Sequence, residues 1–404
     1  MKTMKVALLA TAALAAVSVS ARADDTAAIK AQLEALTARI AQLEAAPAVP
    51  TGFSLLTISE GTQTQVPGLE TLNKDRAGSG DKATIIGILP TADAPASTTI
   101  EWSGYVRAAI VYVDYGDNTE DSTDLDVYAR GQLKVVGKTD TAVGEVGVQM
   151  RLRADFDGNG WDEGYPFAGK SRDVYAKEAW GWWAFTPELT LGGGYTGSLG
   201  NIGYGYDGAC NCYYTDNADV AFDPGDTSQL RLSYASGPIS AGIALEDATG
   251  GGGYFADNGP VDDGIGAAAE IKYSGDAFNG EISAVWRDGG SASDDSYRVG
   301  AGVGFSLGDI ASISVGAQMG TSDTDVDFWG ASILASMNLS DTSHIEVAYG
   351  HKEYDPGGDV DAFLAGLYYD PVDQLTIGIE AEYIDDDSNL DEVMQIGLVT
   401  VFRF

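Results

Sequence analysis

The sequence has 404 residues, with 60 acidic against 23 basic side chains and a formal net charge of −37 at pH 7. A chain this acidic repels phosphate, which excludes nucleic acid as a partner. Beyond the first 23 residues, no stretch approaches the roughly 18 consecutive apolar residues that a transmembrane helix needs, so a membrane-spanning form must cross as β-strands.

Residues 1–23 have the pattern of a secretory signal peptide. A short start with two lysines precedes an apolar run at 6–19, and residues 21–23 read Ala-Arg-Ala, which fits a cleavage site. We therefore expect export and a mature chain that starts at Asp24. The alternative is a membrane anchor that is not removed.

Residues 24–46 predict a periplasmic coiled-coil helix. Apolar side chains recur at spacings of four and three, at Ile29, Leu33, Leu36, Ile40 and Leu43. About three heptads are too short to be stable alone, so this helix would form only where other contacts already gather the chains. The mixed Leu and Ile seam is compatible with a trimer. A single amphipathic helix lying on the barrel or the membrane remains the alternative.

Residues 47–99 are expected to form a periplasmic linker with a small β segment. Pro47 and Pro50 end the helix, and two β-like pieces follow at 53–59 and 83–89. The pattern assigns no task to this region.

Residues 100–404 predict an all-β, 16-stranded antiparallel transmembrane β-barrel. Segments of about ten residues alternate in direction, and short connections alternate with long ones, as in single-chain bacterial barrels. The upward strands are expected at 100–113, 143–156, 188–195, 239–247, 279–288, 311–319, 343–353 and 374–385. Their downward partners are expected at 124–137, 173–185, 227–236, 264–274, 295–307, 327–339, 360–370 and 392–404.

The alternation is clearest at residues 374–383. One face carries Leu375, Ile377, Ile379, Ala381 and Tyr383, and the other carries Gln374, Thr376, Gly378, Glu380 and Glu382. Lipid accepts the first set but not the second. Polar side chains on the inner face of so wide a barrel imply a water-filled lumen.

The last segment, residues 392–404, ends on Phe404 and cannot be left as an exposed edge. Pairing with the first strand would close the barrel. Aromatic residues near strand ends on the apolar face fit the interfacial girdles of such barrels, at Trp102, Tyr273, Trp286, Trp329 and Phe404.

The longest connection, residues 196–226, follows the fifth strand, and an insertion of this size in a regular barrel is usually functional or disordered. With this third loop, the SGYVR at 103–107 and the terminal VFRF, the chain resembles the Gram-negative general porins, most of all their alphaproteobacterial branch. The resemblance covers roughly residues 100–404. The region before it departs from the simplest porins, which begin almost directly with the first strand.

The resemblance implies a homotrimer of 16-stranded barrels in the outer membrane, surrounded by lipid and lipopolysaccharide. Each barrel would be a passive aqueous pore, with the third loop folded inward to form the constriction. The resemblance also implies that Phe404 is read by the barrel-assembly machinery.

A pore needs a narrow place with an electric field across it. Candidates on the third loop are Tyr204, Tyr206, Asp207, Asp216 and Asp219. Opposing bases are expected on the pore wall at Arg107, Arg130, Lys134, Arg151, Arg153 and Arg231. The overall charge favours mild cation preference, which local arginines could reverse.

Two further features of the loops leave alternatives open. Cys210 and Cys212 could form a strained disulfide in the oxidising periplasm, remain thiols, or bind a metal, for which nearby His ligands are lacking. We expect no cofactor, but the acidic stretch at 155–163 resembles the first half of a calcium loop, through Asp155, Asp157, Asn159, Asp162 and Glu163. The alternative is a plain acidic loop. Divalent ions could also bridge acidic loops to lipopolysaccharide phosphates.

An enzyme is not expected. Residues 164–171 fit the phosphate-binding loop pattern but precede a strand-like segment instead of a helix. The two histidines, His344 and His351, fall in one predicted strand, where lumen lining is the simpler interpretation. The resemblance to general porins favours an outer-membrane diffusion porin for small hydrophilic solutes and ions. Alternatives are a channel selective for an anion or a sugar, or a barrel anchor whose coiled coil tethers the outer membrane to peptidoglycan.

Overall fold

The computed structural model describes residues 37, 55–67, 69, 81–89, 98–116, 123–156, 174–208, 220, 224–248, 264–289, 294–387 and 390–404. The predicted signal peptide, and the predicted coiled coil apart from Thr37, lie outside these residues and stay predictions. Two compact units divide the chain, one of Met1–Leu56 with Ile88–Ser97 and one of Thr57–Gly87 with Thr98–Phe404. Within the described part of the chain, no helix combines the length and the apolar character that crossing a membrane requires.

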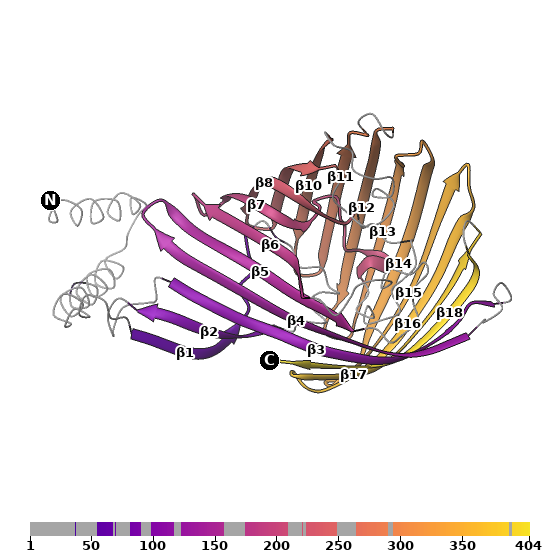
Figure 1. Cartoon of the computed structure of the whole chain (residues 1–404), viewed down its shortest axis with the longest axis horizontal. Helices are drawn as coiled ribbons and strands as arrows, with labels where there is room; N and C mark the ends of the chain where they lie inside the picture. Colours follow the sequence, from indigo (N-terminus) through magenta and orange to yellow (C-terminus); the bar gives the residue numbers. More distant parts are fainter. Residues whose placement is uncertain are drawn as a thin grey trace, which may run out of the picture. The chain divides into compact units, whose positions relative to one another are not determined.

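Sixteen antiparallel strands form a closed barrel in the second unit (Figure 1). The first eight are β3(Thr98–Asp114), β4(Thr123–Thr141), β5(Gly144–Phe156), β6(Tyr175–Ala184), β7(Leu189–Gly197), β8(Asp226–Ser236), β9(Ile239–Asp247) and β10(Ile265–Ser274). The others are β11(Phe278–Arg287), β12(Ser296–Leu307), β13(Ala311–Thr321), β14(Asp327–Ser340), β15(Ser343–Asp355), β16(Asp359–Val372), β17(Leu375–Asp386) and β18(Leu390–Arg403). All sixteen predicted strands are therefore confirmed, each within about four residues of its predicted ends.

The barrel closes where β18 pairs with β3. The register runs from Met394 opposite Asp114 to Arg403 opposite Tyr105. At the tip, Phe404 N donates to Gly104 O at 3.1 Å, and Gly104 N donates to Phe404 O at 3.3 Å. The last strand thus leaves no unpaired edge along this seam, as its sequence requires.

Apolar and polar side chains alternate between the two faces of the barrel wall. On β17, Ile379 is 50% exposed on the outer face, while Glu380 beside it is 0% exposed on the inner face. The five aromatic residues that the sequence places in girdles are all exposed on the outer face. A wall with this pattern meets hydrocarbon outside and presents hydrogen-bonding groups inside.

Two further strands, β1(Leu55–Thr62) and β2(Lys82–Leu89), pair with each other and belong to the same sheet as the barrel strands. They match the β-like pieces predicted at 53–59 and 83–89. Residues 57–87 belong to the same compact unit as the barrel.

Candidate functional site

A block of basic side chains lines the inner face of β3, β4 and β5. Its members are buried in the wall and are five of the six predicted bases, Arg107, Arg130, Lys134, Arg151 and Arg153. Strand register brings them together, because Arg107 lies opposite Arg130, and Lys134 lies opposite Arg151. We call these five residues the basic wall.

Hydrogen bonds fix the side chains of the basic wall. Arg130 forms an ion pair with Asp155, which also accepts from Tyr175 Oη at 2.7 Å. The guanidinium of Arg153 donates twice to Gln132 Oε1, at 3.2 and 2.9 Å. Asp155, and Glu178 at 3.4 Å from Arg151, place two carboxylates against the guanidinium groups of the basic wall.

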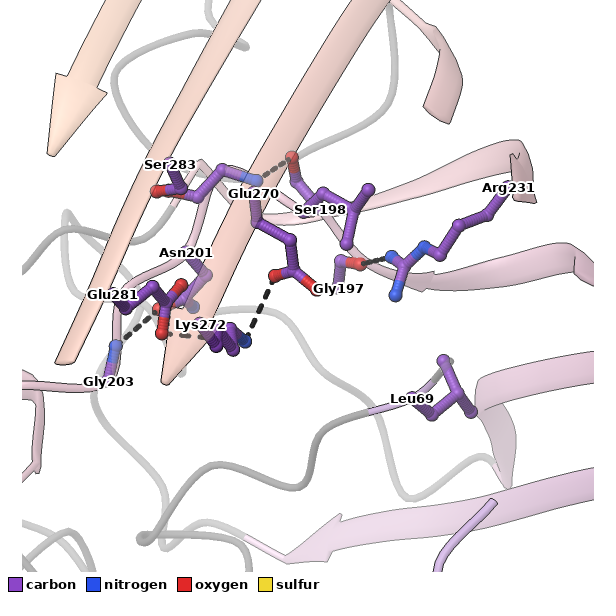
Figure 2. Close-up of polar contacts among 12 residues, drawn as sticks. Leu69, Gly197, Ser198, Asn201, Gly203, Arg231, Glu270, Lys272, Glu281 and Ser283 are labelled. Carbon is purple, nitrogen blue, oxygen red and sulfur yellow. Dashed lines mark hydrogen bonds and ion pairs between the residues drawn. The ribbon is translucent and has the colours of Figure 1, made fainter. Parts of the chain in front are cut away.

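Arg231 lies apart from the basic wall, on β8. Its guanidinium lies over the ring of Trp180 at 5.3 Å. It also donates to Gly197 O at 2.9 Å (Figure 2). It therefore holds the end of β7, where the longest connection begins.

The first part of that connection is attached to β9 and β11. We call residues 198–225 the third connection; its described residues are 198–208, 220, 224 and 225. Ser198 Oγ donates to both carboxylate oxygens of Glu246 on β9, at 2.9 and 2.8 Å, and Leu199 N donates to Glu246 Oε1 at 3.1 Å. Ser283 on β11 donates to Gly200 O at 2.9 Å.

The far part of the third connection is attached to β13, β14 and β17. It contains the short helix η2(Gly205–Gly208), which contacts β13, β14 and β15. Gly205 N donates to Ser314 Oγ at 3.0 Å, and Tyr206 N donates to Ser332 Oγ at 2.9 Å. The hydroxyl of Tyr206 donates to Glu382 on β17.

Glycine on β12 makes room for this connection. A Cβ atom at Gly302 would lie 2.4 Å from the ring of Tyr204, far inside van der Waals contact. From the sequence, the glycines at 300, 302 and 304 in an alternating strand are expected to relieve crowding or to permit curvature. In the structure, the side chain that requires glycine at 302 is Tyr204, one of the two tyrosines predicted to line the constriction.

The inner face is not polar all the way round. Tyr206 and Val220 of the third connection belong to a buried apolar cluster with inward-facing residues of β3, β4 and β14–β18, among them Phe328, Leu334, Ala348, Leu364, Tyr368 and Val399. Sequence reasoning missed this cluster, although strand 392–404 reads as apolar on both faces. Inward apolar residues are stable here because other side chains cover them.

Carboxylates on the inner face were also missed as a group. Lys272 on β10 lies between Glu270, at 2.9 Å, and Glu281 on β11, at 3.4 Å (Figure 2). On β17, Glu380 accepts from Tyr368 Oη at 3.0 Å. The alternation placed Glu380 and Glu382 inward but gave no sign of their partners.

The Gram-negative porin family model matches residues 83–389, well over half of the chain. The chain belongs to the Gram-negative porin family. This places the porin in the outer membrane as a channel for passive diffusion, and members of this fold and family are not enzymes. The search of curated proteins gave no match.

Similarity to a solved structure agrees with this fold. A loop L8 deletion mutant of OmpT, an outer membrane protein of Vibrio cholerae, is similar at 13% identity and a TM-score of 0.52, covering 76% of this chain and 100% of that one. A double mutant of the Rh. blastica porin is also similar, at 14% identity with a TM-score of 0.49, over 76% of this chain and 100% of that one.

Several predicted site residues of the porin fall outside the described part. These are the side chain of Asp207, and Asp216, Asp219, Cys210 and Cys212 on the third connection. Of the calcium-loop candidates, Asp157, Asn159, Asp162 and Glu163 also lie outside it. Asp155 is described, and both of its carboxylate oxygens accept hydrogen bonds, from Arg130 and Tyr175. The calcium and disulfide predictions stay predictions.

The two histidines lie on opposite faces of β15. His344 stacks on Tyr368 at 4.9 Å and faces Asp370 at 3.4 Å. His351 Nδ1 lies 3.0 Å from Asp361 on β16. Among the described residues, one group of three has the donor set and spacing of a metal site, namely His351, Asp359 and Asp361.

Proposed function

We propose that the third connection folds into the barrel and narrows the channel. Small hydrophilic solutes and ions then diffuse between it and the basic wall. The observation that carries this proposal is the pair of anchors on Glu246 of β9 and Glu382 of β17. From β9 to β17 is eight steps in a ring of sixteen strands, so a segment attached to both reaches opposite sides of the interior.

The mechanism is partition followed by sieving. Polar side chains on the inner face replace part of the hydration that a solute loses on entry, and no energy input is needed. Solutes wider than the gap between the third connection and the basic wall are excluded because they do not fit through it.

The charges at the constriction orient dipolar solutes that pass through the channel. The basic wall supplies fixed positive charge on one side, and we propose that Asp207, Asp216 and Asp219 of the third connection supply the negative side. Opposed charges orient dipolar solutes and set the ion preference. The acidity of the whole chain favours cations, and the basic wall opposes this preference locally.

Sieving is tested by shortening the connection. Because Ser198 N donates to Gly225 O at 3.0 Å, its ends are adjacent, and an Asn-Gly turn can replace residues 199–224. Swelling of liposomes in sugars of increasing size should show a larger size limit for this variant than for the wild type. An unchanged size limit in a folded barrel overturns the proposal, and saturable uptake of one sugar or anion by the wild type points to a selective channel instead.

Selectivity is tested on the basic wall. Arg107→Gln with Arg153→Gln removes two positive charges, so the reversal potential in a salt gradient should shift toward cations. Lys82→Gln removes a charge from an exposed lysine on β2 and serves as the control. Equal reversal potentials in both variants contradict the assigned role of the basic wall.

We also propose that three copies associate in the outer membrane, as the resemblance to general porins implies. The apolar outer face of the barrel supports burial against lipid or against a neighbouring copy. Conductance that rises in groups of three equal steps tests this assembly.

A further inference from the structure

The chain between β1 and β2 makes a closed excursion. Gln63 N donates to Asp81 O at 2.8 Å, so the two ends of the connection between β1 and β2 are adjacent. Next to it, Leu69 N donates to Val66 O at 3.1 Å and Gln65 Nε2 donates to Leu69 O at 3.3 Å, so these three residues form a turn. We call residues 63–69 the inner turn; its described residues are 63–67 and 69.

Polar side chains of the barrel wall hold one side of the inner turn. Thr64 donates both its N–H, at 2.7 Å, and its hydroxyl to the carboxylate of Glu101 on β3. Lys134 Nζ donates to Gln63 Oε1 and Lys138 Nζ donates to Thr64 Oγ1, both at 3.2 Å. Charged groups at this end of β3 and β4 are thus used to hold a piece of the chain.

Apolar side chains hold the other side. Val66 and Leu69 are buried in one cluster with Val136 of β4 and with Trp180 and Trp182 of β6. Both tryptophans face inward, since Trp183, the next residue along β6, is exposed on the outer face.

Glycines on the neighbouring strands allow these tryptophans to lie flat on the wall. A Cβ atom at Gly147 would lie 2.0 Å from the Trp182 ring, and one at Gly192 would lie 2.2 Å from the Trp180 ring. Trp182 Nε1 also donates to Glu145 Oε1 at 3.1 Å. Two indoles laid flat form an apolar surface on the inner face, which water covers poorly and which Val66 and Leu69 cover well.

The anchors all lie near the barrel end that carries the short turns and the chain terminus. Glu101 is close to the start of β3, Lys138 close to the end of β4, and Trp182 close to the end of β6. The anchors of the third connection on Ser332 and Glu382 lie deeper along their strands.

We propose that the inner turn is a second constriction of the channel, which partly plugs the short-turn mouth and sets solute passage in series with the third connection. This inference rests on the channel function proposed above. Seated on the mouth, the inner turn occupies part of the open cross-section, and its hydrogen bonds engage Glu101, Lys134 and Lys138. The substrates affected are the same small hydrophilic solutes.

The first test removes the inner turn and keeps the strands. Asn-Gly in place of residues 64–80 joins Gln63 to Asp81 as a two-residue hairpin turn. Because conductance follows the open cross-section, single-channel conductance in planar bilayers should rise about 1.5-fold or more. Heat-modifiable gel mobility confirms that the barrel is folded.

The second test displaces the inner turn by charge. Val66→Asp with Leu69→Asp places two carboxylates against the tryptophans and should release the turn, with a similar rise in conductance and a red shift of tryptophan emission. Thr62→Asp, at an exposed position on β1, is the matched control and should change neither reading.

Conductance measurements distinguish a failure of the second constriction from a failure of the channel function. If the wild type conducts and the folded variants show the same conductance and the same size limit, the proposal of a second constriction is overturned. The proposed channel function is then unaffected. A folded wild type that does not conduct at all overturns the channel function and this inference with it.

Discussion

Removing one oxygen atom from Tyr206 tests how the third connection is held. Tyr206→Phe keeps the ring in its apolar cluster and deletes the hydrogen bond to Glu382 on β17. Tyr368→Phe is a matched control, because Tyr368 is equally buried at 1% exposure and donates to the neighbouring Glu380, but lies on the wall itself.

The magnitude follows from the chemistry of the lost bond. A hydrogen bond to a charged acceptor contributes about 1.5–3 kcal/mol, which corresponds to a change of about 10- to 100-fold in the ratio of attached to detached connection. The bonds from Gly205 N to Ser314 and from Tyr206 N to Ser332 remain. The connection therefore stays attached most of the time but detaches more often.

Amide hydrogen exchange reads this difference directly. Peptides that contain residues 205 and 206 should lose protection by about 10- to 100-fold in Tyr206→Phe, since both N–H groups are covered only in the attached state. Single-channel current should become noisier in the same variant. Unchanged protection in Tyr206→Phe, or an equal loss in Tyr368→Phe, would refute the reasoning.

Other predictions concern the wall, the anchors and pH. Leu398→Arg on the outer face of β18 should lower the free energy of unfolding in lipid by about 2–4 kcal/mol, measured by urea titration, and no loss would argue against lipid contact there. Gly147→Val should overpack the Trp182 ring and cost about 1–3 kcal/mol by the same assay, where wild-type stability would contradict the packing. Glu246→Gln weakens three hydrogen bonds and should speed proteolysis within the third connection, whereas wild-type rates would remove this anchor. Burial, with the nearby charge of Asp124, raises the pKa of Tyr115 from 10.0 to about 12, so its stabilising contribution is complete below pH 10 and is lost as pH rises through about 12; ultraviolet titration against Tyr115→Phe checks this.

The strands could be predicted because a membrane barrel imposes its pattern at every residue. A strand with lipid on one face does not tolerate a register shift of one residue. Such a shift would point the side chains of Glu380 and Glu382 into the hydrocarbon of the membrane. The same rigidity made the basic wall foreseeable. The pairing of β3 with β4 and of β4 with β5 makes inward positions such as Arg107 and Arg130 neighbours.

The path of the third connection could not be predicted in the same way. Tyr206 and Glu382 are 176 residues apart, and no local pattern links them. The contact depends on which inward surfaces are apolar. The sequences of β16 and β18 are apolar on both faces. This pattern alone does not show whether another segment of the chain covers the inner face.

The inner turn gave still less signal. Val66 and Leu69 stand alone in a polar stretch, so neither helical nor strand periodicity identifies them as buried. The tryptophans that receive them could be seen in the sequence, and Gly147 and Gly192 lie close to the turns of their strands. Only the register across β5, β6 and β7 shows that each glycine faces a tryptophan ring.

Conductance of the purified, folded protein in a planar lipid bilayer tests the central claim most directly. An open, polar-lined barrel predicts stepwise increases in current that are proportional to voltage and to salt concentration. A barrel that is folded and inserted but passes no current would contradict the account.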